Sequence, residues 1–228
     1  MRNHHIRSFL VACAVLISLS LSVTPAQASR KTNKVVIVGD SVANVLRWAP
    51  KTMKPLWKSR YNVILETWGC QQLLNEGCNE KTKLSSLDRI VLHRKDKIDV
   101  YVVATGYNDT GPAYLANAIA QISAEVKKQG ASLIWLTYQE NANVKAKSRT
   151  FNAVIRAKQV KSRLQILDWN RISRNKKSWF SGTSVHMNET GGLNFARSIK
   201  NALDIHFGYG TTTSTSTTTS TTTIPIAE

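Results

Sequence analysis

The chain has 228 residues, of which 42% are hydrophobic and 20% are charged, and its formal net charge is +17. Beyond residue 28 no segment is long and apolar enough to span a bilayer, and no metal-ligand spacing such as His-Glu-x-x-His occurs. The basic residues are scattered without a recognised nucleic-acid-binding signature. We therefore expect no nucleic acid partner. The rival interpretation, a secreted nucleic-acid-binding protein, is supported only by the net positive charge.

The first 28 residues are typical of a secretory signal peptide. Arg2 and Arg7 precede an apolar stretch from Phe9 to about Val23, and small residues lead up to Ala28, where we predict cleavage. The alternative is an uncleaved anchor. Removal lowers the Lys and Arg count from 31 to 29 against 14 acids, which leaves a net charge of +15. We expect a secreted or envelope-associated protein that meets anionic wall polymers or lipid head groups; a solvated basic surface with no partner is the other reading.

Apolar runs of strand length alternate with amphipathic segments from residue 29 to residue 209. The predicted strands cover 35–38, 61–65, 100–104, 132–136 and 164–167, and the predicted helices cover 43–57, 84–95, 113–128, 145–158 and 192–207. Such alternation indicates right-handed crossovers and a parallel sheet. We predict one α/β domain with three layers, a five-stranded parallel sheet between two helical layers, and a monomeric state.

Residues 210–228 differ sharply from the domain, because Thr211 to Thr223 contain only Thr and Ser. Such a run cannot build a core, and we expect a disordered spacer open to O-glycosylation.

Two cysteines, Cys70 and Cys78, remain after the signal peptide with its Cys13 is removed. In an oxidising compartment we expect them to form a disulfide beside Gly69. The alternative is a pair of buried free thiols.

The most informative motif is Gly39-Asp40-Ser41-Val42, which directly follows the first apolar run. A Ser at the end of a buried strand presents its hydroxyl at the carboxyl edge of the sheet, where ligands of α/β proteins bind. A helix beginning near Ser41 would direct unpaired N–H groups to the same place. By itself the motif is equally typical of an ordinary strand-to-helix turn.

Three further features follow in order, each at a strand end or in a loop. Gly69 follows the second strand, Gly106-Tyr107-Asn108-Asp109 follows the third, and His186 precedes the last helix, five residues before Gly191. With Gly39-Asp40-Ser41 these blocks resemble the SGNH hydrolases, also called GDSL-like esterases and lipases, over residues 34 to 207. The Gly-Asp-Ser-Val form resembles bacterial acyl-ester branches of that family.

The resemblance implies an ester hydrolase that needs no cofactor or metal. Ser41 would be the nucleophile and His186 the general base. The N–H groups of Ser41 and Gly69 and the side chain of Asn108 would bind the oxyanion. We expect Asp40 and Asp109 to be structural.

One position departs from the family pattern, because Thr183 stands where an Asp three residues before the His is usual. Three explanations are open: a backbone carbonyl near residues 182 to 184 accepts from His186, Asp168 reaches the imidazole, or activity is largely lost. The expected function is cleavage of acyl esters, O-acetyl esters among them, with acyl transfer also compatible. The rival is a degraded SGNH-type module that binds anionic envelope polymers.

Overall fold

The computed structural model describes residues 32–48, 53, 56 and 60–209 of the chain. The predicted signal peptide at 1–28 and the predicted tail at 210–228 lie outside the described residues. No helix within the described ranges is long and apolar enough to cross a membrane.

The centre of the domain is a sheet of five parallel strands in the order β2-β1-β3-β4-β5. The strands are β1 (Asn33–Gly39), β2 (Tyr61–Thr67), β3 (Val100–Ala104), β4 (Ser132–Leu136) and β5 (Gln165–Leu167). The chain runs from β1 outward to β2 and then returns to β3 on the other side of β1. The strand order therefore reverses between β1 and β3, which is where open α/β sheets bind their ligands.

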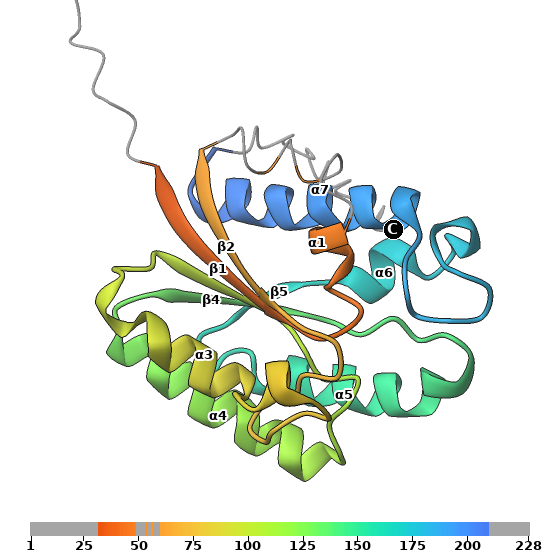
Figure 1. The fold of residues 1–228 in the computed structure, drawn as a ribbon, viewed down its shortest axis with the longest axis horizontal. Coiled ribbons are helices and arrows are strands. Elements are labelled where there is room, and N and C mark those ends of the chain that lie inside the picture. The colour runs from red at the N-terminus through yellow and green to blue at the C-terminus, as the bar shows by residue number, and fades with distance from the viewer. Residues whose placement is uncertain (1–31, 49–52, 54–55, 57–59, 210–228) are drawn as a thin grey trace, which may run out of the picture. The chain divides into compact units, whose positions relative to one another are not determined.

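Helices cover both faces of this sheet, so the predicted three-layer fold is confirmed (Figure 1). One layer contains α1 (Val45–Trp48), α6 (Trp169–Ser173) and α7 (Glu189–His206), and the other contains α3 (Ser86–Leu92), α4 (Pro112–Lys128) and α5 (Lys145–Lys158). Short 3-10 helices occupy Glu80–Thr82, His93–Lys95, Ala142–Val144 and Lys177–Trp179.

The apolar run of β1 fills both cores, because successive side chains of a strand point to opposite faces. Val35 and Ile37 pack under α7, and Val36 and Val38 pack against α4; all four are fully buried. Burial on both faces explains why this strand is a continuous apolar run without polar alternation.

Several helix boundaries differ from the sequence expectation, among them those of α3, which covers Ser86–Leu92 and not 84–95. Two differences have a visible cause. The helix expected from Ala43 begins at Val45, because residues 41–44 form a turn in which the Asn44 N–H donates to the Asp40 carbonyl. Most of its expected second half lies outside the described residues. The last helix begins at Glu189, three residues before the expected start, because the Asn188 side chain accepts the Gly191 N–H at 3.0 Å and caps the helix.

Candidate active site

Ser41 lies two residues after the end of β1, at the point where the strand order reverses. Its Oγ is 2.9 Å from Nε2 of His186, although 145 residues separate the two in the chain. Gly39 permits this turn by its lack of a side chain, since a Cβ there would lie 2.4 Å from the Ala43 Cβ. The fold thus brings the predicted nucleophile and the predicted base into hydrogen-bond contact.

Asp40 fixes the Ser41 turn to the loop that follows β3. Its carboxylate is fully buried and accepts N–H groups from Val42, Gly106 and Tyr107, each at 3.0 Å. Burial raises the pKa of Asp40 to about 6, although these three hydrogen bonds act in the opposite direction. Asp40 is therefore a structural residue that joins two loops, as expected from the sequence.

His186 is presented by a tight hairpin that precedes α7. Phe180 and Met187 pair as an antiparallel bridge, and the Ser181 N–H donates to the His186 carbonyl at 3.0 Å. The Asn141 side chain donates to the Ser184 carbonyl at 3.3 Å, which connects the hairpin to the loop after β4. These contacts hold His186 in place while its side chain stays exposed.

The group that faces the other imidazole nitrogen is the hydroxyl of Ser184. Its Oγ lies 2.7 Å from His186 Nδ1 and also accepts the backbone N–H of His186 at 3.0 Å. The backbone carbonyl near residues 182 to 184, one of the three explanations left open by the sequence, does not fill this role, because the hairpin turns the Ser184 side chain back toward the ring. A hydroxyl oxygen has two lone pairs, so it can accept both N–H groups and hold the proton on Nδ1.

Asp168 does not take this place either. Its carboxylate accepts from Thr137 Oγ1 at 2.9 Å, from Arg156 at 2.8 Å and from the Arg171 N–H at 3.2 Å, where it caps α6. Burial acts to raise the pKa of Asp168, but the hydrogen bonds from Arg156 and Thr137 outweigh it and lower the pKa. The Asp168 carboxylate therefore connects the end of β4 with α5 and α6.

Gly69 stands in the turn after β2, next to the Ser41 turn. The Trp68 N–H donates to the Gly39 carbonyl at 3.0 Å, so the two turns are directly joined. Within the described ranges neither the Ser41 N–H nor the Gly69 N–H donates to a protein acceptor. A Cβ at Gly69 would meet nothing within 4 Å, so open space borders this residue on the side where a side chain would lie.

Asn108 connects the third loop to the second. Its side-chain Nδ2 donates to the carbonyl of Gln71 at 3.2 Å, and the buried Asp109 accepts the Leu73 N–H at 2.9 Å. One amide hydrogen of Asn108 is thereby used and the other is available. Both residues hold the loop after β3 against the loop after β2.

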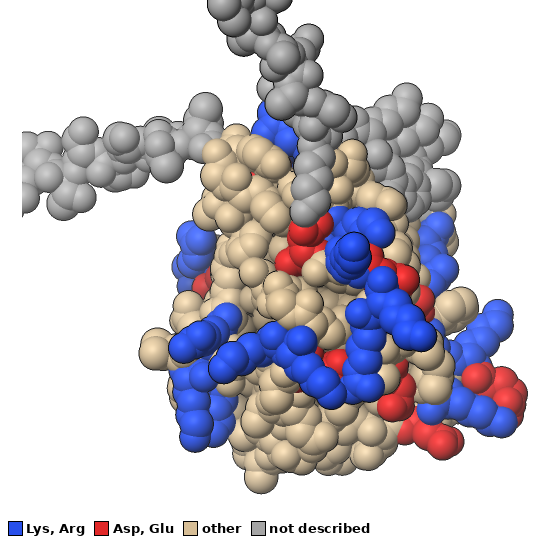
Figure 2. Space-filling model, turned by 90° about the vertical axis from the view of Figure 1, so that its left-hand side faces the viewer, with Lys and Arg blue, Asp and Glu red and all other residues tan. Residues whose placement is uncertain are grey.

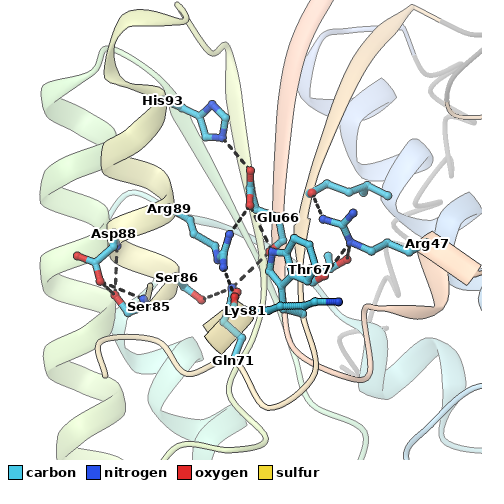
Figure 3. Close-up of polar contacts among 12 residues, drawn as sticks. Arg47, Glu66, Thr67, Gln71, Lys81, Ser85, Ser86, Asp88, Arg89 and His93 are labelled. Carbon is cyan, nitrogen blue, oxygen red and sulfur yellow. Dashed lines mark hydrogen bonds and ion pairs between the residues drawn. The ribbon is translucent and has the colours of Figure 1, made fainter. Parts of the chain in front are cut away.

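Arginines clamp the outer side of the Gly69 loop (Figure 3). Arg47 donates from Nε to the Thr67 carbonyl at 2.8 Å, and Arg89 pairs with Glu66 at 2.6 Å. The guanidinium carbons of Arg47 and Arg89 lie 4.2 and 5.3 Å from the centre of the Trp68 ring, within the range of cation–π attraction. The residue before Gly69 is thus held from two helices, α1 and α3.

A disulfide between Cys70 and Cys78 fixes the other side of Gly69. Cys70 has a φ of 54°, a left-handed conformation that non-glycine residues seldom adopt. The predicted pairing is therefore present, directly beside a predicted oxyanion donor.

The assembled site has the parts required for nucleophilic attack on a carbonyl: a hydroxyl in contact with an imidazole, a polar group on the far ring nitrogen, and unengaged N–H groups nearby. Among the described residues no group of three or more His, Cys, Asp or Glu side chains is placed to hold a metal ion.

Several solved structures are similar to this fold. TesA matches with a TM-score of 0.62 and 17% identity, over 76% of this chain and 99% of TesA. A GDSL-like lipase from Bacteroides thetaiotaomicron matches with a TM-score of 0.60 and 16% identity, over 79% of this chain and 92% of the lipase. The chain has the SGNH hydrolase fold.

An acetyl xylan esterase shares the SGNH fold at a TM-score of 0.56 and 17% identity, over 75% of this chain and 99% of the esterase. No protein-family model and no curated protein sequence matches the chain. The three-dimensional similarity confirms the fold that the motif resemblance implied.

Ser184 is the residue of this site that the sequence reasoning missed. A side-chain hydroxyl two residues before the His was available as a signal. Only the hairpin from residue 180 to 187 brings it against Nδ1.

Proposed function

We propose that this protein is a secreted serine ester hydrolase of the SGNH type, with Ser41 as nucleophile and His186 as general base. The observation that carries the proposal is the 2.9 Å contact between Ser41 Oγ and His186 Nε2, with Ser184 Oγ 2.7 Å behind Nδ1. When Nδ1 carries the proton and donates a hydrogen bond to Ser184 Oγ, Nε2 is unprotonated and can accept the proton of Ser41.

The chemistry proceeds through an acyl-enzyme. Ser41 Oγ bonds to the acyl carbon while its proton passes to His186 Nε2, and the carbonyl electrons move onto oxygen. The N–H groups of Ser41 and Gly69 and the Asn108 amide are the proposed donors to that oxyanion. When the bond to the alcohol breaks, the alcohol oxygen takes the proton from Nε2. Water then repeats the sequence, releases the acid and restores Ser41; a sugar hydroxyl in place of water would give acyl transfer.

The rival function is an SGNH-type module that binds without catalysis. The observation that favours it is the neutral Ser184 where a serine triad has a carboxylate, because a hydroxyl stabilises the imidazolium less than an ionised group does.

Hydrolysis of p-nitrophenyl esters separates the two functions. We expect the wild type to cleave the acetyl or butyryl ester above background, and Ser41→Ala and His186→Ala to reduce turnover by at least about 10³-fold. Ser181→Ala, an exposed serine of the same hairpin, is the matched control and should retain full turnover. Background rates for the folded wild type across acetyl to octanoyl esters would refute the esterase proposal and leave the binding module as the function to test.

A further inference from the structure

A hollow of about 550 Å³ opens at the edge of the sheet opposite to Ser41. The last turns of α4 and α5 and the segments that enter β4 and β5 line it. It lies at the amino ends of the strands, whereas Ser41 follows the carboxyl end of β1. Five residues of strand separate the two edges by about 16 Å, so this hollow is no part of the candidate active site.

The charged side chains that line the hollow are all basic: Lys127, Lys158, Lys161 and Arg163. Within the described ranges none of the four forms an ion pair. Figure 2 faces the amino ends of the strands and shows Lys and Arg side chains in a band across this surface. We define Lys127, Lys158, Lys161 and Arg163 as the basic hollow.

Helix dipoles account for only part of this charge. Lys127 and Lys158 occupy the last turns of α4 and α5, where cations are favoured. Lys161 and Arg163 lie beyond α5, in the turn before β5. Backbone hydrogen bonds fix that turn: the Ser162 N–H donates to the Lys158 carbonyl at 2.9 Å, and the Arg163 N–H donates to the Val160 carbonyl at 3.1 Å. A fixed turn therefore places Lys161 and Arg163 at the hollow, where they form no ion pair with the described residues and do not lie in a helix.

Further basic residues extend the row beyond the hollow. The amino ends of β1, β3, β4 and β5 follow one another at a spacing of about 4.8 Å. Lys34 lies in β1, and Lys95 and Lys97 precede β3. Asp96 and Asp99 also lie here: an Asp96 carboxylate oxygen is 2.7 Å from His93 Nδ1, and Asp99 accepts the backbone N–H of Lys34 at 2.8 Å. With Lys34, Lys95 and Lys97 the basic residues outnumber these two acids. A row of cations longer than the hollow fits an extended anion better than a single one.

The residue types define the partner further. The row is mostly Lys, which binds phosphate as a point charge and not as a planar fork. No aromatic residue lines the hollow, so the stacking platform on which single-stranded nucleic acids depend is absent from these residues. We propose that the basic hollow binds a linear, non-nucleotide polyanion whose repeating unit carries phosphate.

The test is binding of fluorescein-labelled, long-chain inorganic polyphosphate to the purified full chain, measured by fluorescence anisotropy from 0.05 to 0.3 M NaCl. The variant Lys158→Ala/Lys161→Ala/Arg163→Asn removes three charges, and Asn tolerates the φ of 50° at residue 163. We expect its affinity to fall at least about tenfold at 0.15 M salt. The slope of log K against log salt should become shallower by about two, by analogy with single-stranded nucleic acids.

The matched control is Lys145→Ala/Lys177→Ala/Arg197→Ala, which removes the same charge from exposed residues elsewhere on the surface. It should weaken binding less than twofold. Equal losses in both triple variants would show attraction by net charge alone and overturn the proposal. If the triple variant of the basic hollow does not fold, the double variant Lys158→Ala/Lys161→Ala takes its place in the comparison with the control.

Two competitors and one variant complete the design. If inorganic phosphate displaces the probe below 1 mM, the hollow is a site for a single anion. If vesicles with about 30% phosphatidylglycerol bind as tightly as polyphosphate, and the triple variant loses this binding, the hollow binds a membrane surface. Either result overturns the polymer assignment. Ser41→Ala should bind polyphosphate like the wild type, so failure of the proposed esterase function and failure of this proposal are distinguishable. Absence of wild-type binding at 0.05 M salt would refute the proposal outright.

Discussion

The hydroxyl of Ser184 lies 2.7 Å from Nδ1 of His186, on the side of the imidazole that faces away from Ser41. In a serine triad this side is held by a buried carboxylate, which fixes the tautomer and stabilises the imidazolium. Ser184 can fix the tautomer but carries no charge. The site is therefore arranged as a serine–histidine pair with a neutral orienting residue.

The first prediction concerns the orienting hydroxyl. A hydrogen bond to a charged group contributes about 1.5 to 3 kcal/mol, so Ser184→Ala should lower kcat about tenfold to a hundredfold. The KM should change little, because Ser184 faces the ring and not the ester. Steady-state kinetics on p-nitrophenyl butyrate measure both parameters.

Thr183→Ala is the control for that substitution, since Thr183 is the exposed neighbour of Ser184. It should keep kcat within about twofold. A larger loss for Thr183→Ala than for Ser184→Ala would contradict the role of Ser184.

A second prediction separates function from stability at Gly69. Because a Cβ there meets no atom within 4 Å, Gly69→Ala should leave the free energy of unfolding unchanged or raise it by up to about 1 kcal/mol. The added methyl group would extend into the open space beside this residue and restrict the approach of an ester to the proposed donor N–H, so turnover should fall at least about tenfold. Urea unfolding and kinetics on the same preparation measure the two effects. Unchanged turnover in a folded Gly69→Ala protein would remove Gly69 from the oxyanion donors.

A third prediction concerns Asn108. Removal of one oxyanion donor typically lowers kcat by about 10² to 10³, and Asn108→Ala should show this with a smaller change in KM. Asn108→Asp is the matched variant: it keeps the size of the side chain but has no amide group, so it loses both the proposed oxyanion donor and the hydrogen bond to the Gln71 carbonyl. Asn108→Asp should therefore be as inactive as Asn108→Ala, and an active Asn108→Asp enzyme would be incompatible with this assignment.

A fourth prediction follows from the raised pKa of Asp40. Its pKa of about 6 in the folded protein exceeds the ordinary value of 3.8, so the folded state binds more protons between pH 4 and pH 6. The contribution of Asp40 to stability is therefore full below pH 4 and decreases as the pH rises through 6. At 1.36 kcal/mol per pKa unit the decrease is about 2 to 3 kcal/mol.

Asp40→Asn cannot titrate and isolates this effect. We expect the variant to be less stable than the wild type, because an amide group would face the N–H groups that the carboxylate accepts. The difference in unfolding free energy should shrink from pH 4 to pH 7 in urea titrations. A difference that is constant with pH would show that Asp40 titrates at an ordinary pKa.

A fifth prediction concerns the disulfide. The bond closes a loop between residues eight positions apart, and the chain-entropy estimate for such a loop is about 2 to 3 kcal/mol. Cys70→Ser/Cys78→Ser should lower the free energy of unfolding by that amount and also lower turnover, because Gly69 adjoins Cys70. Full turnover in the reduced or substituted protein at a temperature where it stays folded would argue against a positioning effect.

Strands buried on both faces were predictable because their signal is local. The runs at β3 and β4 match the observed bounds, and so does α5, whose ends at Lys145 and Lys158 follow from its periodicity. The start of α1 was placed two residues too early, because the backbone first forms the turn held by Asp40 and Asn44 before the helix begins at Val45.

Contacts between distant segments were the part that the sequence could not supply. The order of the motifs led us to propose Ser41, Gly69, Asn108 and His186 as one site. The contact of Ser184 with the imidazole depends on a bridge between Phe180 and Met187. The basic hollow likewise forms only when the end of α4 is placed beside residues 158–163.

The most direct test of the central claim is covalent labelling of Ser41. Wild-type protein treated with a fluorophosphonate and digested for mass spectrometry should carry one adduct, on the peptide that contains Ser41, and His186→Ala should label at least about a hundredfold more slowly. A folded wild type that gains no adduct at Ser41, or that labels equally fast without His186, would contradict a serine nucleophile activated by His186.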